Sequence, residues 1–266
     1  MGRRLGQHFL HDQSVLGKIL AAAELRPEDQ VLEVGPGKGV LTARLLETGA
    51  RVTAIEVDPA LAESLREKWG GHERFNLIEG DILKADLSPR PLFGNDSRFA
   101  IVANLPYYLS SPFLFRVIAR RQYLTRMVLM VQREIADRLV AMPETGKTYG
   151  SLSIAGHHVF SMKRLFLVPP GAFTPPPKVD SAVVGFEPRP PRLNPDDERT
   201  FLEHVQKIFT QRRKILLSTV QRFHPGLSEH QIEQLRDKFG KARPDALSPE
   251  AHLEFFALLR NLSLPD

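Results

Sequence analysis

The sequence predicts an α/β protein in which an open, mostly parallel sheet is followed by a small all-α domain. Short apolar strands alternate with amphipathic helices from residue 13 to about residue 134. This order favours a parallel sheet with helices on both faces. The pattern changes after about residue 160, where a proline-rich hairpin precedes three helical segments. A chain of 266 residues, 42% of them hydrophobic, is long enough for one large core and a smaller second unit.

The elements follow in order. Residues 13–24 place Val15, Leu16 and Ile19 on one helical face before Pro27 ends the pattern. Further strands are expected at residues 30–35, 51–58, 75–81, 98–104 and 126–134, with helices at 40–49, 59–70 and 111–121. Gly49 closes one of these helices, and Pro59 opens the next.

The last third of the chain predicts a different architecture. Residues 164–188 read as two antiparallel strands joined by a proline-rich loop, at a sheet edge, and residues 187–195 read as a stiff linker. Helical patterns with acidic or serine caps follow at residues 196–223, 228–240 and 248–262. We therefore expect one domain at residues 1–187 and a helical domain at residues 188–266.

Composition narrows the function classes. The net charge of +5 and pI of about 9.5 favour a polyanionic partner such as nucleic acid. The absence of cysteine excludes disulfides, thiolate metal sites and cysteine nucleophiles. No window approaches the roughly 20 apolar residues of a spanning helix, and the N-terminus does not match a signal peptide. We expect a soluble, cytoplasmic protein without a metal, in which His157 and His158 are core or surface residues.

A glycine-rich turn follows the first strand of the sheet, in "LEVGPGKGVLT". Gly35, Gly37 and Gly39 allow backbone to approach a ligand closely at the start of a helix. The dinucleotide-binding pattern would need glycine at Val40, and no Gly-Lys-Ser/Thr sequence closes a phosphate-binding loop. A nucleoside-type ligand fits this turn, and a purely structural turn is the alternative.

Polar side chains stand where the next strands end. Glu56 lies 21 residues after Gly35, where a carboxylate can accept hydrogen bonds from ribose hydroxyls. Asp81 follows the third strand, and Asn104 ends the fourth. Because ligands of open parallel sheets bind at the carboxyl ends of the strands, these residues predict one crevice. Taken singly, Glu56 could be a solvated charge and Asp81 a helix cap.

Six motifs together resemble one family. They are "GQHFL", "EVGPGKGVLT", "IEVD", "GDIL", "NLPYYLSSP" and "GAFTPPPKVDSAVV". They resemble S-adenosylmethionine-dependent methyltransferases and, more narrowly, the ribosomal RNA adenine dimethyltransferase family, from about Gly6 to the C-terminus. The "IFTQRRKIL" stretch is more similar to the small-subunit enzymes than to the relatives that modify large-subunit RNA and confer macrolide resistance. The resemblance implies a Rossmann-like catalytic domain, with S-adenosylmethionine as its cofactor, and a C-terminal domain that binds ribosomal RNA.

The resemblance also implies roles for individual residues. His8 stands where members most often carry asparagine, and an imidazole can donate one hydrogen bond as an amide does. The implied cofactor residues are His8 and Leu10 at the methionine end, Gly35 and Gly37 in the loop, Glu56 at the ribose, Asp81 and Ile82 at the adenine, and Asn104.

The "NLPY" stretch is expected to hold a flipped adenine. The side-chain carbonyl of Asn104 and the backbone carbonyl of Leu105 would accept hydrogen bonds from the adenine amino group, and Pro106 would fix the turn between them. Tyr107 would stack on the base, and Phe173 would cover its other face or pack near the methyl group. No general base is needed. Tyr108 is expected to be structural, and the alternative for Asn104 and Tyr107 is a loop cap and an ordinary half-buried aromatic.

Basic residues are candidates for phosphate contacts. They are Arg3, Arg4, Lys147, Arg212, Arg213 and Lys214. Three consecutive residues of a helix cannot point the same way, so at least one of the last three is expected to brace a domain interface. The resemblance implies an enzyme that methylates two adjacent adenosines near the 3' end of small-subunit ribosomal RNA in an assembling subunit, and we expect this enzyme to be a monomer. The alternatives are a large-subunit adenine methylase and a non-catalytic assembly or transcription factor of the same fold.

Overall fold

The computed structural model describes residues 8–263, so the predictions for Arg3 and Arg4 lie outside the described residues. The chain divides into two compact units. The first contains the described residues up to Ala136 together with Phe160–Pro188. The second contains Asp137–Val159 together with the residues from Arg189 onward.

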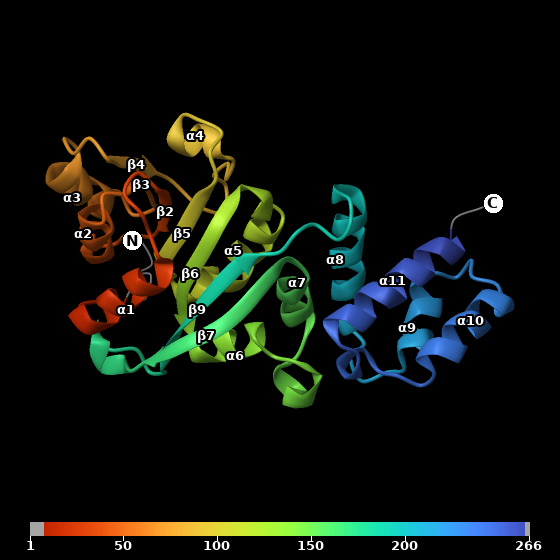
Figure 1. Cartoon of the computed structure of the whole chain (residues 1–266). Helices are drawn as coiled ribbons and strands as arrows, with labels where there is room; N and C mark the ends of the chain where they lie inside the picture. Colours follow the sequence, from red (N-terminus) through yellow and green to blue (C-terminus); the bar gives the residue numbers. More distant parts are fainter. Residues whose placement is uncertain (1–7, 264–266) are drawn as a thin grey trace. The chain divides into compact units, whose positions relative to one another are not determined.

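A seven-stranded mixed sheet forms the centre of the first unit, in the order β4-β3-β2-β5-β6-β9-β7 (Figure 1). Its strands are β2 (Gln30–Val34), β3 (Arg51–Glu56), β4 (Phe75–Glu79), β5 (Phe99–Asn104), β6 (Leu124–Gln132), β7 (Phe160–Val168) and β9 (Ser181–Pro188). Strands β4, β3, β2, β5 and β6 are parallel to one another, whereas β9 is antiparallel to both of its neighbours, β6 and β7. The predicted α/β class and the predicted edge hairpin are confirmed.

Helices cover both faces of this sheet. The helices of the first unit are α1 (Gln13–Ala23), α2 (Val40–Glu47), α3 (Pro59–Trp69), α4 (Pro89–Phe93), α5 (Ser110–Ile118) and the start of α6 (Arg133–Leu139). Val52 of β3 packs in one cluster with α1 and α2, whereas the Thr53 hydroxyl donates a 2.8 Å hydrogen bond to the Leu92 carbonyl of α4. Because successive strand residues point to opposite faces, α4 lies across the sheet from α1 and α2.

The central strands are apolar on both faces because both faces are covered. Five consecutive residues of β5, Phe99 to Ala103, are buried. Two helices beside the sheet begin at aspartate caps, where a side-chain oxygen satisfies free backbone N–H groups. Asp12 accepts from the Val15 N–H at 3.0 Å, and Asp58 accepts from the Ala60 N–H at 2.9 Å.

A two-residue pairing that the sequence does not reveal joins distant segments of the first unit. Strand β1 (Phe9–Leu10) runs antiparallel to β8 (Phe173–Thr174), with Leu10 opposite Phe173. The His11 N–H also donates a 3.0 Å hydrogen bond to the Ala172 carbonyl. The pairing brings the residues before α1 beside the loop between β7 and β9.

The second unit is helical. Its helices are α7 (Ser151–Val159), α8 (Pro195–Phe209), α9 (Leu216–Phe223), α10 (Glu229–Phe239) and α11 (Pro249–Ser263). The 3-10 turns η3 (Pro143–Thr148) and η5 (Pro244–Ala246) also belong to this unit, and the first unit contains η1 (Tyr107–Leu109), η2 (Arg121–Tyr123) and η4 (Pro170–Ala172). Helix α7 packs against α8 and α11, and Tyr149, Ile154, Phe201 and Phe256 share one buried cluster.

Two expectations about this half of the chain differ from the structure. The sequence assigns residues 137–159 to the first domain, but they lie in the second unit. The reason is that α7, in which Leu152, Ile154 and Ala155 are buried, packs against α8 and α11. The segment 196–223 is not one helical stretch, because α8 ends at Phe209 and α9 begins at Leu216. The Leu216 N–H bonds the Ala242 carbonyl at 2.9 Å. No glycine or proline marks this break in the sequence.

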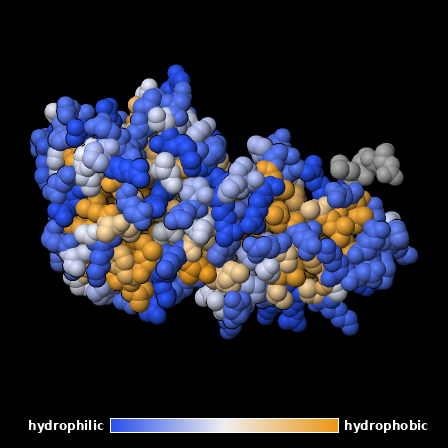
Figure 2. All heavy atoms as spheres, in the orientation of Figure 1, coloured by the Kyte–Doolittle hydropathy of each residue, from blue (hydrophilic) through white to orange (hydrophobic). Residues whose placement is uncertain are grey.

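The surface is largely hydrophilic, and the two adjacent histidines of α7 differ in burial. Hydrophilic side chains cover most of the face seen in Figure 2, with separate hydrophobic areas between them. His158 is buried in α7, with its ring centroid 4.8 Å from that of Phe201, and His157 is half-buried. Within residues 8–263, no helix is long and apolar enough to cross a membrane.

Candidate active site

A pocket of about 280 Å³ lies in the first unit, at the carboxyl ends of β2, β3, β4 and β5. Its walls come from the loops after these strands, from residues 8–10 and from the β8 segment. All residues that the sequence predicts for the cofactor or the target adenine line it, namely His8, Leu10, Gly35, Gly37, Glu56, Asp81, Ile82, Asn104, Leu105, Pro106, Tyr107 and Phe173. The structure therefore gathers both predicted sites in one pocket.

The glycine loop forms the floor of this pocket. Gly37 and Gly39 have φ values of +60° and +73°, which side chains rarely adopt. A Cβ atom at Gly37 would lie 3.1 Å from Phe9 Cε1, and one at Gly39 would lie 2.2 Å from the Trp69 ring. The loop therefore needs glycine both for its conformation and for space, and α2 begins directly after Gly39.

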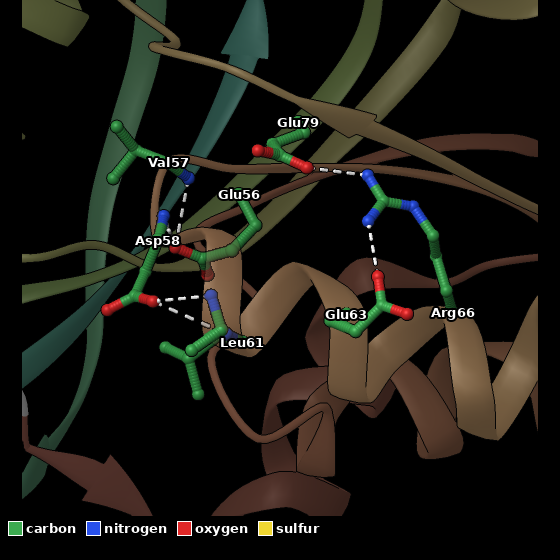
Figure 3. A network of polar contacts seen from close by, with 8 residues as sticks. Glu56, Val57, Asp58, Leu61, Glu63, Arg66 and Glu79 are labelled. Carbon is green, nitrogen blue, oxygen red and sulfur yellow. Dashed lines mark hydrogen bonds and ion pairs between the residues drawn. The ribbon is translucent and has the colours of Figure 1, made fainter.

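The Glu56 carboxylate is fixed by backbone donors (Figure 3). Its Oε1 accepts the N–H groups of Val57 and Asp58, both at 3.0 Å, and its Oε2 accepts the Gly37 N–H at 3.0 Å. The side chain is only 2% exposed. A carboxylate offers about four acceptor sites, so Oε2, with one donor, is the oxygen that retains capacity for a ligand hydroxyl.

A second buried carboxyl group, Glu33, lies beside Glu56. Thr42 Oγ1 donates a 2.6 Å hydrogen bond to Glu33 Oε2, and Glu33 is 1% exposed. Burial raises the pKa of Glu33 to about 8, with the Glu56 charge adding to the increase and the Thr42 hydrogen bond opposing it. Glu33 is therefore mainly protonated near neutral pH, and the pocket wall carries one carboxylate and one neutral carboxyl group at this point.

Asp81 combines a structural and a potential binding role. Its Oδ1 accepts the Leu83 N–H at 2.9 Å, and its backbone carbonyl accepts the Lys84 and Ala85 N–H groups. Within the described residues, its second carboxylate oxygen has no hydrogen-bond partner and remains available to a ligand. The next residue, Ile82, is 4% exposed and supplies an apolar surface.

The segment from Asn104 to Pro106 leaves the end of β5 in a fixed turn. The Leu105 N–H donates to the Met130 carbonyl at 3.0 Å, and the Pro106 carbonyl accepts from the Leu109 N–H at 2.9 Å. The Asn104 amide nitrogen lies 3.5 Å from the His8 carbonyl oxygen, which directs its NH₂ group toward the N-terminal segment. Among residues 8–263, no hydrogen bond to the side-chain oxygen of Asn104 is found, so this oxygen can accept one from a ligand.

Aromatic rings line the same end of the pocket. The Tyr107 hydroxyl and Ser181 Oγ are 3.0 Å apart, and the Tyr107 ring centroid lies 5.7 Å from that of His8. Burial raises the pKa of Tyr107, and the Ser181 hydrogen bond partly opposes this. Phe173, only 3% exposed, is held by the β1–β8 pairing. The half-buried Tyr107 ring is thus anchored beside the polar groups of Asn104.

The hydrogen bond of His8 changes the expectation for its role. His8 Nδ1 lies 2.7 Å from the Pro175 carbonyl oxygen, which can only accept, so Nδ1 carries the proton of the neutral ring. The other ring nitrogen, Nε2, then carries the lone pair of a residue that lines the pocket. The neutral imidazole can accept a hydrogen bond from a ligand ammonium group, whereas the sequence comparison with asparagine suggested a donor.

Several lining residues were not predicted as site residues. Glu33, Val57 and Tyr108 line the pocket, with Val57 44% and Tyr108 53% exposed. Lys38 is also exposed, with its Nζ 4.7 Å from the centroid of the Phe9 ring. Position alone could have indicated Glu33 and Val57, since they stand at strand ends. No sequence signal separates Tyr108 from an ordinary surface tyrosine.

The basic candidates of the second unit fall into two groups. Arg212 donates to the carbonyls of Gly146 and Lys147, both at 2.8 Å, and to Asp245 at 3.0 Å. Arg213, Lys214 and Lys147 have exposed side chains. Arg212 is therefore the bracing residue of its triplet, although the groups it joins all belong to the second unit.

The fold and this pocket together define the class of enzyme to which the protein belongs. A parallel sheet with a reversed terminal hairpin, a glycine loop after its first long strand and acidic residues after the next two are the features of a Rossmann-like methyltransferase. The protein is an S-adenosylmethionine-dependent methyltransferase, and the pocket residues fit that cofactor, with carboxylates at one end and the His8 acceptor at the other.

Comparison with known proteins defines the family. The family described as "Ribosomal RNA adenine dimethylase" matches residues 2–245. "Ribosomal RNA small subunit methyltransferase A" of Geobacter metallireducens is 42% identical over 87% of this chain and 84% of its own. The protein of that name from Thermosynechococcus vestitus is 41% identical over 98% and 97%. The chain belongs to the ribosomal RNA adenine dimethylase family.

Solved structures agree. The 23S rRNA methyltransferase ErmE superposes with a TM-score of 0.72 at 30% identity, over 95% of this chain and 99% of its own. A dimethyladenosine transferase from Plasmodium falciparum superposes with a TM-score of 0.79 at 24% identity, over 97% and 99%, which supports the fold alone.

Proposed function

We propose that the protein dimethylates the N6 amino groups of two adjacent adenosines near the 3' end of small-subunit ribosomal RNA. The observation that carries this proposal is the position of Asn104, Leu105 and Tyr107 in the same pocket as Glu56 and Asp81. A nucleoside cofactor and a flipped adenine can meet there. The family description supports adenine dimethylation, and the names of the relatives at 41–42% identity support the small subunit.

The cofactor would lie across the end of β2. Glu56 Oε2 would accept a ribose hydroxyl, Asp81 would accept from the adenine amino group, and Ile82 would pack on the adenine. His8 Nε2 would accept a hydrogen bond from the ammonium group of the methionine end, beside Leu10. When bound, the cofactor supplies an electrophilic methyl group on its sulfonium sulfur.

The residues of the "NLPY" stretch would activate the target by orientation. An adenine amino group is a poor nucleophile because its lone pair is delocalised into the ring. Hydrogen bonds from this group to Asn104 Oδ1 and the Leu105 carbonyl would favour a pyramidal nitrogen with an available lone pair. Asn104 and Leu105 would thereby present this lone pair to the methyl group that the cofactor supplies, and the amino proton would pass to water.

Aromatic residues would hold the flipped base. Tyr107, anchored through Ser181, would stack on one face, and Phe173 would cover the other or pack near the methyl group. No general base is required, because the methylated nitrogen is strongly acidic. A second transfer requires the monomethylated base to return with its remaining hydrogen turned toward the same acceptors.

RNA would also be held outside the pocket. Lys147, Arg213 and Lys214 are the proposed phosphate contacts of the second unit, together with Arg3 and Arg4 of the N-terminal segment. The second unit, Asp137–Val159 together with the residues from Arg189 onward, would thus bind ribosomal RNA, while the first unit carries the catalytic site. We propose that the enzyme acts as a monomer on assembling subunits in the cytoplasm.

Two other functions remain as alternatives to be tested. The structure superposes well on ErmE, named as a 23S rRNA methyltransferase, but the identity of 30% is lower than the 41–42% shared with the small-subunit relatives. The complete set of pocket residues argues against a non-catalytic assembly factor, which would need neither a cofactor site nor acceptors for an amino group.

The direct test uses labelled S-adenosylmethionine with unmethylated small and large subunits, followed by nucleoside analysis of each RNA. We expect dimethyladenosine at two adjacent positions of the small-subunit RNA only. Methylation confined to large-subunit RNA would replace the proposed substrate, and tight binding of subunits without any transfer would support an assembly factor.

A further inference from the structure

Tyr108 is an exposed aromatic residue in a rigid part of the pocket mouth. It belongs to η1, between Tyr107, whose hydroxyl contacts Ser181, and Leu109, which is 6% exposed. Pro106 begins this turn with a φ of −53°, and its carbonyl accepts the Leu109 N–H. The backbone at Tyr108 is therefore fixed on both sides, although the side chain is 53% exposed.

Within the described residues, Tyr108 has no hydrogen bond and no aromatic partner, unlike the neighbouring Tyr107. The side chain nevertheless lines the pocket rather than the outer surface alone. An aromatic side chain held at the mouth of a ligand site without a partner of its own is available to cover the ligand.

The topology places Tyr108 across from the loop that follows β3. Strand β2 lies between β3 and β5, so the turn after β5 and the loop after β3 flank the glycine loop from two sides. Val57, the residue after Glu56, is 44% exposed and lines the same pocket. Tyr108, from the turn after β5, and Val57, from the loop after β3, are thus two exposed side chains at the mouth of the pocket.

Tyr108 lines the same pocket as the acidic residues Glu56 and Asp81. Partial burial raises the pKa of the Tyr108 hydroxyl, and the negative charges of Glu56 and then Asp81 raise it further. The hydroxyl is therefore influenced by the two carboxylates that the proposed function assigns to the adenosyl group. Tyr107 instead lies beside His8 and Ser181.

We propose that Tyr108 closes over the adenosyl group of bound S-adenosylmethionine and is a positioning residue for the cofactor. The inference rests on the proposed function, because it takes Glu56 and Asp81 as the ribose and adenine ligands. The ring would cover the nucleoside from the β5 side, while Val57 and Ile82 contact it from the β3 and β4 side. The two consecutive tyrosines would then serve different ligands, Tyr107 the target base and Tyr108 the cofactor.

The test compares ligands that share only the adenosyl group. Dissociation constants of S-adenosylhomocysteine and 5'-methylthioadenosine are measured by titration calorimetry for the wild type and for Tyr108→Ala and Tyr108→Phe. Removing a stacked aromatic from a base costs about 5- to 100-fold in affinity. We expect Tyr108→Ala to weaken both ligands by the same factor in this range, and Tyr108→Phe to remain within about twofold, since stacking needs the ring alone.

The control is Phe223→Ala, which removes another exposed aromatic, 38% exposed, that does not line this pocket. It should bind both ligands like the wild type. Thermal unfolding of the free proteins shows whether each variant is folded, and the exposed position of Tyr108 makes loss of folding unexpected.

Three results separate this proposal from the proposed function. Unchanged affinity of Tyr108→Ala for both ligands would overturn the role of Tyr108 while leaving the methyltransferase intact. If Tyr108→Ala binds both ligands normally but has a raised KM for small subunits, the cofactor role of Tyr108 is overturned, and Tyr108 contacts RNA instead. Failure of the wild type to bind either ligand would reject the cofactor site itself.

Discussion

Thr42 and Glu33 form a buried hydrogen-bonded pair, with Thr42 Oγ1 2.6 Å from Glu33 Oε2. The pair joins α2, which follows the glycine loop, to β2, which precedes this loop. Because Glu33 is buried beside the Glu56 carboxylate, the site holds a neutral carboxyl group next to a negatively charged one.

This pair predicts a pH-dependent stability. The pKa of Glu33 is raised in the folded protein from 4.5 to about 8, so the folded state holds a proton that the unfolded state releases. The stabilisation is fully present below about pH 4.5 and is lost as the pH rises through about 8. Glu33→Gln, which keeps the Thr42 hydrogen bond without titrating, should therefore gain in Tm relative to the wild type as the pH rises. Equal pH dependence of the two melting curves from pH 5 to pH 8.5 would contradict this.

The Glu56 carboxylate should determine cofactor affinity. Glu56→Gln removes the charge that its backbone donors and the proposed ribose hydroxyl share. Hydrogen bonds to charged groups contribute about 1.5–3 kcal/mol, so we expect the Kd for S-adenosylhomocysteine to rise about 10- to 100-fold. Glu79→Gln is the matched control, since Glu79 is exposed and bound to Arg66 outside the pocket. If both variants bind equally well, Glu56 does not hold the ribose.

Asn104 should affect transfer rather than cofactor binding. Its side-chain oxygen is the proposed acceptor for the adenine amino group, and removing such a polar contact at a reacting centre costs about 10²- to 10³-fold in rate. We expect Asn104→Ala to lose at least this much in single-turnover methylation, with the Kd for S-adenosylhomocysteine within a few-fold of the wild type. Asn95→Ala, outside the pocket, should keep full activity. Normal turnover by Asn104→Ala would remove the residue from the mechanism.

The glycine loop predicts a contrast between two substitutions of the same kind. Gly39 has a φ of +73°, and an added Cβ would lie 2.2 Å from the Trp69 ring. Gly39→Ala should destabilise the protein by about 2–4 kcal/mol through strain and overpacking. Gly17, inside α1, has nothing within 4 Å of an added Cβ, so Gly17→Ala should stabilise by up to about 1 kcal/mol. Urea unfolding of both variants checks the sign, and destabilisation by both would refute the argument.

The arginine triplet predicts two separable effects. Arg212→Ala breaks bonds to Gly146, Lys147 and Asp245 and should lower the unfolding free energy by about 1–3 kcal/mol. The double variant of Arg213→Ala and Lys214→Ala should melt like the wild type. Its binding to small subunits should weaken, and its slope of log K against log salt should fall by about 1–2. An unchanged slope would exclude Arg213 and Lys214 as phosphate contacts.

The sequence predicts the parts of this molecule that depend on local pattern. Strands such as residues 98–104 are recognisable because both faces are apolar, and their order implies that Gly35, Glu56, Asp81 and Asn104 share one edge of the sheet. The hydrogen bond of His8 to Pro175 could not be foreseen, because it joins residues 167 positions apart through a two-residue strand pairing.

Other features were beyond prediction for different reasons. The break between α8 and α9 has no glycine or proline, and the exposed side chain of Tyr108 depends on how the turn after Pro106 orients two adjacent tyrosines. The placement of residues 137–159 depends on partners that follow β9, so no local pattern contains it.

That placement has a consequence for how the protein is made. Helix α7 is synthesised before β7 and β9, yet it packs against α8 and α11, which are synthesised after both strands. During translation, 35 residues of chain therefore separate the end of this apolar helix at Val159 from the start of its first partner, α8, at Pro195. Termination near residue 188 would leave a chain whose sheet is complete but whose α7 exposes apolar surface, making such a fragment prone to aggregation and degradation.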